Sequence, residues 1–350
     1  MAETITSDQL FTEISHSDQI IIDVRSPAEY NHAHIPGAFS IPLLDDAERK
    51  EIGITFKTQG REAAIVKGFD LTGKKFGDII RDTIHISRSK NVLIYCWRGG
   101  LRSNIMSWIL SIAGFRVSVL HGGYKSFRNR ALNQFDIEKK IIVIGGKTGC
   151  GKSYLLQELR KAGEQIIDLE NLAHHKGSAF GALGQPTQPG NEMFENLLAF
   201  ELAKTDDDKI VWVENESRLI GKCALPDSFF KQLRTAPVIE LNLDRTIRKK
   251  RILQEYGIFP VGLLKEKTAS VKKRLGGLRL KQALNYLDEQ NLDQWCELMI
   301  DYYDQTYQFS NNRRDDSKVH QVYFETDEME KNVREVMNLS KKKFVSHFQL

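Results

Sequence analysis

The sequence has little cysteine and little proline, with four cysteines and eight prolines in 350 residues. The cysteines are scattered and no two form a CxxC pair, which excludes a disulfide scaffold and argues against a structural zinc site. A reducing compartment, the cytoplasm, is therefore expected. No apolar run approaches the ~20 residues that span a bilayer, and the first residues lack the basic and apolar segments of a secretory signal. We therefore expect no membrane association.

The composition is that of an ordinary globular protein, with 41% hydrophobic and 27% charged residues. A chain of this length predicts about two domains. The formal net charge is only +4, but residues 245–281 contain twelve basic and two acidic residues. Such a concentration of positive charge favours a surface for a polyanion, with a solvated helical face as the alternative.

Apolar strands alternate with amphipathic helices in two successive series, which predicts an α/β fold with two parallel sheets. The first series includes the strands at 19–23, 91–96 and 117–120, and the second starts with the strand at 141–145. The predicted domains cover residues 8–134 and 138–350, and the second becomes helical and basic after Asp244. A loop rich in glycine and proline, residues 174–191, interrupts the second series and is expected to be functional.

Cys96 lies between a predicted strand and a glycine-rich turn into a helix. Backbone N–H groups in such a turn converge, and the helix N-terminus and nearby arginines add positive potential, so a thiolate is favoured. Cys96 is therefore the predicted catalytic nucleophile, in preference to a buried structural cysteine. The anion-binding loop around it is predicted to comprise Trp97, Arg98, Gly99, Gly100, Arg102 and Ser103.

Residues 146–153, GKTGCGKS, fit the G-x-x-x-x-G-K-[ST] phosphate loop between a strand and a helix. The predicted phosphate-binding residues are Gly146, Thr148, Gly149, Gly151, Lys152, Ser153 and Glu214. Glu214 ends a later strand and is favoured over Glu216 by the alternation in VWVEN. The hydroxyl of Ser153 could bind Mg²⁺, although no metal is certain and no tightly bound cofactor is expected. The motif predicts phosphate or diphosphate binding and leaves open whether a nucleotide binds.

Three segments resemble the rhodanese family: IDVRSPAEYNHAHIPGAFSIPL (22–43), CWRGGLRS (96–103) and LHGGYKSF (120–127). The resemblance implies a rhodanese-like domain at 8–134 whose Cys96 carries a chalcogen. Asp23 and Arg25 are interpreted as a structural ion pair, and Glu29 and His34 as packing residues. The spacing from Cys96 to Arg102 is C-x5-R, whereas the usual sulfurtransferase loop resembles C-x4-R. The C-x5-R spacing is similar to that of cysteine phosphatases.

The chain as a whole resembles the bacterial tRNA 2-selenouridine synthase family. Besides both loops, the segments that carry the resemblance are LAHHKGSAFGALGQPTQ (172–188), VWVENESRLIG (211–221) and KRLGG (273–277). It implies that wobble 2-thiouridine in tRNA is S-geranylated by geranyl diphosphate. Selenium from selenophosphate then replaces the geranylthio group through a selanyl-cysteine on Cys96, with the released phosphate held by the loop amides and Arg102.

The tRNA, bound through its anticodon region, is then the polyanion expected at residues 245–281. The predicted tRNA-binding residues are Arg248, Lys249, Arg251, Lys273 and Arg274. An enzyme that supplies selenophosphate is a further candidate partner.

Three other functions stay open. The first is a P-loop NTPase or phosphotransferase with a rhodanese-like sulfurtransferase or regulatory domain. The second is a cysteine phosphatase fused to a binding module, and the third is an RNA-binding protein without enzymatic activity.

Overall fold

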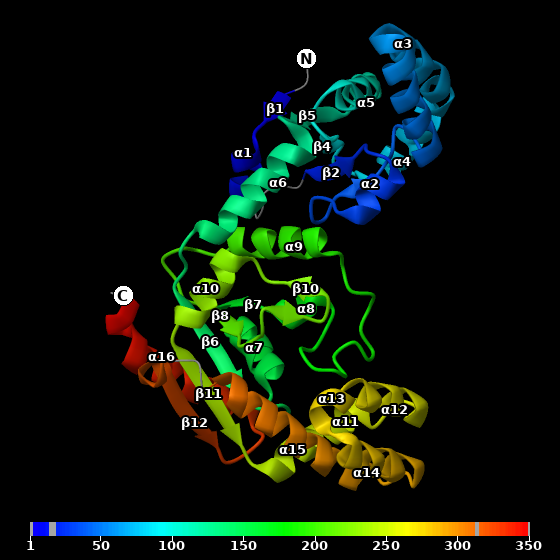
Figure 1. Ribbon diagram of the computed structural model, residues 1–350. Helices are drawn as coiled ribbons and strands as arrows, with labels where there is room; N and C mark the ends of the chain where they lie inside the picture. Colours follow the sequence, from blue (N-terminus) through cyan, green and yellow to red (C-terminus); the bar gives the residue numbers. More distant parts are fainter. Residues whose placement is uncertain (1–2, 14–18, 312–314, 349–350) are drawn as a thin grey trace. The chain divides into compact units, whose positions relative to one another are not determined.

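The computed structural model describes residues 3–13, 19–311 and 315–348, and the chain forms two compact units (Figure 1). Unit 1 consists of Met1–Asp136 and Gly190–Lys204, and unit 2 of Ile137–Pro189 and Thr205–Leu350. Residues 190–204 therefore pack with unit 1, although by sequence position they lie inside the second predicted domain.

Unit 1 is built on a five-stranded parallel sheet with the order β1-β5-β4-β2-β3. The strands are β1 (Glu3–Ile5), β2 (Ile20–Asp23), β3 (Phe39–Ser40), β4 (Asn91–Tyr95) and β5 (Arg116–Leu120). The central strands β2 and β4 are mostly apolar, as expected for strands that are covered on both faces.

Within the described residues of unit 1, seven helices accompany this sheet. They are α1 (Ser7–Glu13), α2 (Pro27–His32), α3 (Asp46–Thr72), α4 (Phe76–Ile86), α5 (Leu101–Ile112), α6 (Gly123–Asn133) and α9 (Asn191–Ala203), with short 3₁₀ turns at Gly73–Lys75 and Gln134–Asp136. Helix α3 is kinked at Gly60, whose φ of 88° breaks the helical conformation.

Unit 2 contains a second five-stranded parallel sheet, with the order β12-β11-β6-β8-β7. Its strands are β6 (Ile141–Gly146), β7 (Gln165–Ile167), β8 (Val211–Glu214), β11 (Val238–Leu243) and β12 (Val319–Phe324). A small antiparallel pair, β9 (Leu219–Ile220) and β10 (Cys223–Ala224), follows β8. The parallel α/β architecture predicted from the alternating strands and helices is confirmed in both units.

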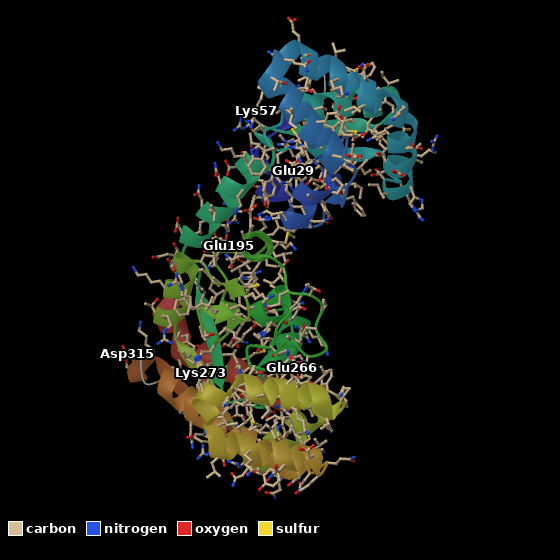
Figure 2. The ribbon with its side chains drawn as sticks, turned by 45° about the vertical axis from the view of Figure 1, so that its right-hand side comes forward. Glu29, Lys57, Glu195, Glu266, Lys273 and Asp315 are labelled. Carbon is tan, nitrogen blue, oxygen red and sulfur yellow. The ribbon has the colours of Figure 1, made fainter. Side chains whose placement is uncertain are left out.

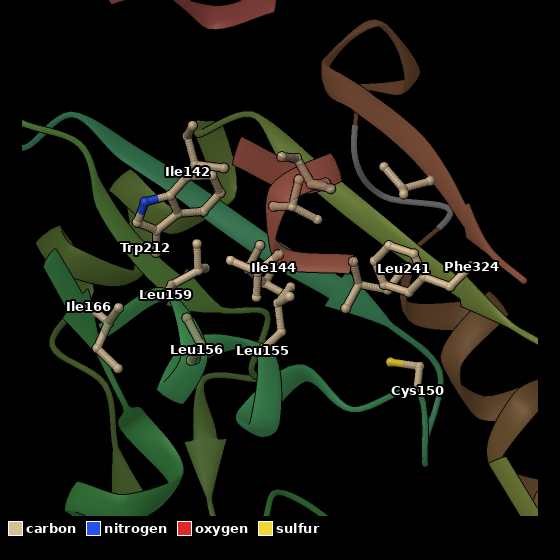
Figure 3. Close-up of a cluster of buried hydrophobic side chains, with 14 of the residues drawn as sticks. Ile142, Ile144, Cys150, Leu155, Leu156, Leu159, Ile166, Trp212, Leu241 and Phe324 are labelled. Atoms are coloured by element: carbon tan, nitrogen blue, oxygen red, sulfur yellow. The ribbon is translucent and has the colours of Figure 1, made fainter. Parts of the chain in front are cut away.

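The core of unit 2 lies between this sheet and helices α7 (Lys152–Lys161) and α16 (Met329–Phe348). Figure 3 shows this cluster, in which Ile142, Ile144 and Trp212 of the sheet lie near Leu155 and Leu156 of α7. Each of these five side chains is almost completely buried. Since α7 begins directly after the phosphate loop, burial of its apolar face fixes the loop against the sheet.

The remaining helices of unit 2 are α8 (Leu169–Ala173), α10 (Asp227–Thr235), α11 (Arg245–Tyr256), α12 (Val261–Ser270), α13 (Lys272–Leu275), α14 (Gly277–Asp288) and α15 (Leu292–Asn311), with a 3₁₀ turn at Asp316–Lys318. Helices α11–α15 gather around a second cluster that includes Trp295, Met299 and Ile300 (Figure 1). Gly276 has a φ of 88°, which breaks the helical conformation between α13 and α14.

Among the described residues, no helix combines the length and the apolar character that crossing a membrane requires.

Candidate functional site

Cys96 directly follows β4, and the loop after it ends at the N-terminus of α5. The loop is held close to the start of α6, where Tyr124 N donates to Cys96 O at 2.8 Å. A Cβ atom at Gly123 would lie 2.2 Å from that same carbonyl oxygen, so this approach requires glycine. The loop conformation is therefore fixed by backbone contacts rather than by the cysteine itself.

The Cys96 thiol is 4% exposed and is surrounded by hydrogen-bond donors. The backbone N–H of Gly100 donates to Sγ at 3.3 Å. Burial raises the pKa of Cys96, but the nearby Ser103 hydroxyl and Arg98 N–H, with the charge of Arg102, outweigh it and lower the pKa overall. The arrangement favours a thiolate and offers N–H groups to an oxyanion beside it.

Arg102 is already paired. Its guanidinium donates to both carboxylate oxygens of Glu29, at 2.6 and 3.3 Å. Glu29 also completes the capping box at the start of α2 with Ser26. The positive charge of Arg102 still favours the Cys96 thiolate, but Glu29 uses part of the hydrogen-bonding capacity of Arg102.

Arg98 and Trp97 are exposed, Trp97 by 40%. Among the described residues, Arg98 takes part in no ion pair, so it is the cation of this loop that remains available to an incoming anion. The structural interpretation of Asp23 and Arg25 fits the structure, since the two form a buried ion pair at 2.6 Å.

The phosphate loop connects β6 to α7, as its motif predicts. Lys152 Nζ donates to the carbonyl oxygen of Gly146 at 3.0 Å, so the side chain folds back over the loop. Burial disfavours the charged form of Lys152, but the neighbouring Cys150, Glu170 and Glu216 raise its pKa overall. Lys152 therefore stays cationic at neutral pH, as binding of a phosphate group requires.

Arg248 and Arg251 hold the phosphate loop in place from α11. Arg248 Nε donates to Thr148 O at 2.9 Å, and the guanidinium forms an ion pair with Asp304 of α15. Arg251 contacts Gly149 O and pairs with Asp327.

The Arg248 side chain is only 5% exposed and its donors face the interior of unit 2. The structure therefore places Arg248 and Arg251 in the support of the phosphate loop rather than on the predicted tRNA surface. The physical reason is that α11 follows β11, which neighbours β6, so its first turns lie against the loop.

The rest of the basic stretch is divided between paired and free cations. Lys249 forms ion pairs with Asp293 and Glu297 of α15. Lys273 and Arg274 on α13 are exposed, and no ion pair of either is found among the described residues. Figure 2 shows Lys273 on the helical part of unit 2, with Glu266 of α12 on the same part.

A cavity of about 860 Å³ opens beside the phosphate loop. It is lined by the loop glycines, by the segment around Ser178 and by residues of α11 and α15. Arg274 also lines it, which brings one exposed cation to the cavity. The cavity is large enough for a diphosphate with an organic group attached.

Glu216, not Glu214, lines this cavity. Glu214 is 1% exposed, and its carboxylate accepts a hydrogen bond from the backbone N–H of Glu170 at 2.7 Å. Glu214 therefore stabilises the first turn of α8. Glu170 in turn accepts the hydroxyl of Ser153 at 2.9 Å. The alternation in VWVEN points to the wrong carboxylate because β8 ends at Glu214 and the chain turns there.

Glu216 shares this end of the cavity with Lys152 and Glu170. Burial and the charge of Glu170 raise the pKa of Glu216 to about 8, although Lys152 opposes the shift. Ser153 and Glu170 could offer oxygen atoms to a cation, yet within the described ranges no group of three His, Cys, Asp or Glu side chains has metal-binding geometry. Lys152 and the N–H groups of the phosphate loop are the groups here that favour an anion.

The sequence patterns did not assign Glu170 or Tyr307 to the phosphate site, and they ranked Glu216 below Glu214. The hydroxyl of Tyr307 accepts the Gly146 N–H at 2.7 Å and donates to Glu240 at 2.8 Å. The signal for Glu170 is present in the sequence, because it follows β7 and the carboxyl ends of parallel strands meet at one edge. Tyr307 lies on a helix 161 residues from the loop, and no local pattern indicates it.

The fold and the two loops define a chain that joins a rhodanese-like unit with a loop cysteine to a P-loop unit. Family comparison agrees, since a rhodanese-like domain matches residues 6–130 and the tRNA 2-selenouridine synthase AAA domain matches residues 139–342. The chain belongs to the tRNA 2-selenouridine synthase family.

Two curated relatives named tRNA 2-selenouridine synthase illustrate the similarity. The one from Shewanella sediminis is 33% identical over 90% of this chain and 94% of its own length. The one from Nitrosomonas europaea is 36% identical over 70% of this chain and 65% of its own length. Among solved structures, an N-terminal domain of a Clostridium difficile 630 protein is 37% identical and covers 36% of this chain and 97% of that chain, with a TM-score of 0.34.

Proposed function

We propose that this protein is a tRNA 2-selenouridine synthase that works in two steps on the wobble uridine of tRNA. In the first step the sulfur of 2-thiouridine attacks C1 of geranyl diphosphate, the C1–O bond breaks and diphosphate leaves. The uridine N3 proton is lost, so the product is a neutral S-geranyl base. In the second step selenium from selenophosphate replaces the geranylthio group at C2.

The phosphate loop of unit 2 supports the first step. Diphosphate gains negative charge as the C–O bond breaks, and Lys152 with the loop N–H groups can stabilise that charge. The cavity beside the loop has room for the rest of the donor. Family membership and a cavity that joins a diphosphate site to aromatic walls favour this proposal over an NTPase.

The Cys96 loop supports the second step. We propose that the thiolate attacks selenium, so that an S–Se bond forms and the Se–P bond breaks. The bonding pair then stays on phosphorus, so the inorganic product is phosphite and not the phosphate that the family resemblance implies. The selanyl-cysteine attacks C2 and geranylthiolate leaves. A low-molecular-weight thiol then attacks the Cys96 sulfur, which breaks the Se–S bond, leaves selenium on the base and forms a mixed disulfide that a second molecule of the same thiol reduces. Cys96 is the only cysteine of unit 1, so this thiol comes from elsewhere.

The exposed cations of α13 support binding of tRNA. Lys272, Lys273 and Arg274 lie on one short helix, and Arg274 also lines the cavity. An RNA backbone bound there would bring a splayed anticodon base close to the phosphate loop. An enzyme that supplies selenophosphate would act on the Cys96 side of the reaction.

Mass spectrometry of tRNA nucleosides tests the division between the two steps. We expect Cys96→Ser to abolish 2-selenouridine and leave S-geranyl-2-thiouridine. Lys152→Ala should weaken diphosphate binding by about 10- to 100-fold, the size of a hydrogen bond to a charged group, and lower both products. Equal loss of geranylation in both variants would contradict the separate roles.

The inorganic product tests the role of Cys96 in particular. Phosphorus NMR of a single turnover should show phosphite if Cys96 carries selenium. Release of phosphate would instead mean that selenophosphate attacks the base directly and that the thiolate never bears selenium.

A further inference from the structure

Glu29 occupies the guanidinium that the C-x5-R spacing brings to the Cys96 loop. Nη1 of Arg102 donates to Oε2 of Glu29 at 2.6 Å, and Nη2 donates to Oε1 at 3.3 Å. An arginine that binds a phosphate group commonly does so through two such parallel N–H donors. Both terminal nitrogens of Arg102 therefore already face a carboxylate, and an incoming oxyanion does not meet this pair of donors.

The Glu29 carboxylate is itself held in place in the first turn of α2 (Figure 2). Its Oε2 accepts the Ser26 N–H at 3.1 Å and lies 3.8 Å from Nε of Arg49. Burial raises the pKa of Glu29, but Arg102, the Ser26 N–H and Arg49 outweigh it and lower the pKa overall. Glu29 is therefore ionised at neutral pH, and the side chain of Arg102 cannot turn toward the loop without the loss of an ion pair.

The rest of the Cys96 loop offers donors that do not depend on Arg102. The Gly100 N–H donates to Cys96 Sγ at 3.3 Å. The Ser103 hydroxyl is completely buried and has no hydrogen-bond partner among the described residues. Arg98 is exposed beside them. An anion that reaches Sγ therefore meets backbone N–H groups, a hydroxyl and Arg98, while the charge of Arg102 is offset by Glu29.

Selenophosphate offers two atoms to a thiolate. Attack at phosphorus forms an S–P bond and breaks the P–Se bond, and selenide leaves with the bonding pair. This path gains most from donors that surround the phosphoryl oxygens, because charge is redistributed over them. Attack at selenium forms an S–Se bond and leaves the pair on phosphorus. A loop whose arginine is bound to a carboxylate gives the first path little support.

We propose that Glu29 is a positioning residue that holds Arg102 away from oxyanions at the Cys96 loop, so that the thiolate reacts with selenophosphate at selenium rather than at phosphorus. This inference rests on the proposed function for the identity of the donor. A second consequence does not depend on that donor, namely that inorganic phosphate binds weakly beside Cys96 and leaves the thiolate accessible.

Protection of Cys96 from iodoacetamide by inorganic phosphate tests the restraint on Arg102 in the full-length protein. Mass spectrometry of the Cys96 peptide makes the measurement specific to this loop, so phosphate bound in unit 2 does not contribute. Glu29→Gln should lower the apparent Kd for phosphate about tenfold or more, because Arg102 can then form charge-assisted hydrogen bonds with the anion. Glu51→Gln, which removes a carboxylate from an ion pair with Lys67, is the matched control and should change this Kd less than about twofold.

Two further variants separate positioning from a merely structural role of Glu29. In the Glu29→Gln background, Arg102→Ala should abolish the gain in phosphate affinity, since the gain depends on Arg102. The pH profile of Cys96 alkylation should move to lower pH in Glu29→Gln alone, because the charge of Arg102 is no longer offset. If Glu29→Gln does not fold, Glu29→Asp keeps the charge but withdraws the oxygens from Arg102, and it should lower the phosphate Kd at least about threefold.

The products of a single turnover with selenophosphate in the absence of tRNA test the choice between the two atoms. The unchanged protein should yield selanyl-cysteine at Cys96 and phosphite. Glu29→Gln should divert part of the reaction to phosphorus, so phosphorus NMR should show phosphate from hydrolysis of the phosphocysteine, together with released selenide.

The two possible failures are distinguishable. If the unchanged protein places no selenium on Cys96, the proposed second step is wrong, and so is the selectivity assigned to Glu29. If the unchanged protein forms selanyl-cysteine but Glu29→Gln binds phosphate as weakly as Glu51→Gln and yields phosphite alone, Glu29 does not restrain Arg102, and the proposed function stands without it.

Discussion

The reactivity of Cys96 depends on donors that the local chain supplies. The thiol is buried, which by itself would keep it protonated, yet the Ser103 hydroxyl and the Arg98 N–H favour its ionised form. Ser103 lies in the first turn of α5, where backbone N–H groups also lack partners within the helix. A single side chain therefore helps to decide whether the loop carries a thiol or a thiolate.

Replacement of Ser103 by alanine should raise the pKa of Cys96, since the nearby hydroxyl that favours the thiolate is lost. The rate of alkylation of Cys96 by iodoacetamide, measured against pH, should move to higher pH in Ser103→Ala. Ser111→Ala on the same helix serves as a control and should leave the profile in place. A profile that does not move would mean that Ser103 has no part in thiolate stabilisation.

Glu216 makes the phosphate site sensitive to pH. Its folded-state pKa of about 8 lies above the ordinary value of 4.5, so folding favours the protonated form. The stability that this contributes is complete below pH 4.5 and is lost as pH rises through about 8. The affinity for diphosphate should also fall as pH rises through about 8, because ionised Glu216 adds a negative charge near Lys152.

Titration with inorganic diphosphate from pH 6 to pH 9 checks this prediction, together with thermal unfolding across the same range. Glu216→Gln should bind diphosphate with little dependence on pH near 8. An unchanged pH dependence in this variant would assign the titration to another group.

At the scale of elements, helices α11 and α13 share the basic stretch but have different tasks. The first turns of α11 place Arg248 against the phosphate loop and Asp304, whereas α13 presents Lys272, Lys273 and Arg274 to solvent. Charge counted along the sequence cannot separate these cases, since both helices are rich in basic residues. Pairing with α15 removes most of the charge of α11 from the surface.

Reversal of charge on α13 should weaken tRNA binding without loss of stability. Lys273→Glu should lower the affinity for tRNA and reduce the slope of log Kd against log salt concentration by roughly one. Arg248→Ala should instead destabilise unit 2 by about 3 kcal/mol, because the buried guanidinium is lost together with its ion pair to Asp304 and its hydrogen bond to Thr148 O. Filter binding at several salt concentrations and thermal unfolding of both variants distinguish the two roles.

At the scale of the molecule, α9 lies between the two segments of unit 2 in the sequence but packs in unit 1. Asn196 is 0% exposed, accepts from Arg128 and donates to His34 O and Tyr124 Oη. Phe200 packs against Phe127 of α6. The chain therefore passes between the units three times, and the long loop at 174–190 forms part of one of these passages.

Asn196→Ala should destabilise unit 1 by about 1–3 kcal/mol, since it leaves buried polar partners unsatisfied. Calorimetric unfolding of the full chain should show the first unit's transition at lower temperature. Lys204→Ala, at an exposed ion pair just after α9, should leave that transition nearly unchanged. Equal effects of the two variants would mean that α9 contributes little to unit 1.

The sequence by itself determined the parallel α/β architecture, the positions of both loops and the helix break at Gly276, because each of these follows from local patterns of apolar residues and glycine. Tertiary structure alone decided that α9 belongs to unit 1, that Glu216 rather than Glu214 lines the cavity, and that Arg248 supports the phosphate loop. These outcomes depend on which distant elements pack together. A local pattern fixes the conformation of a segment, but burial and ion pairing are properties of its neighbours in space.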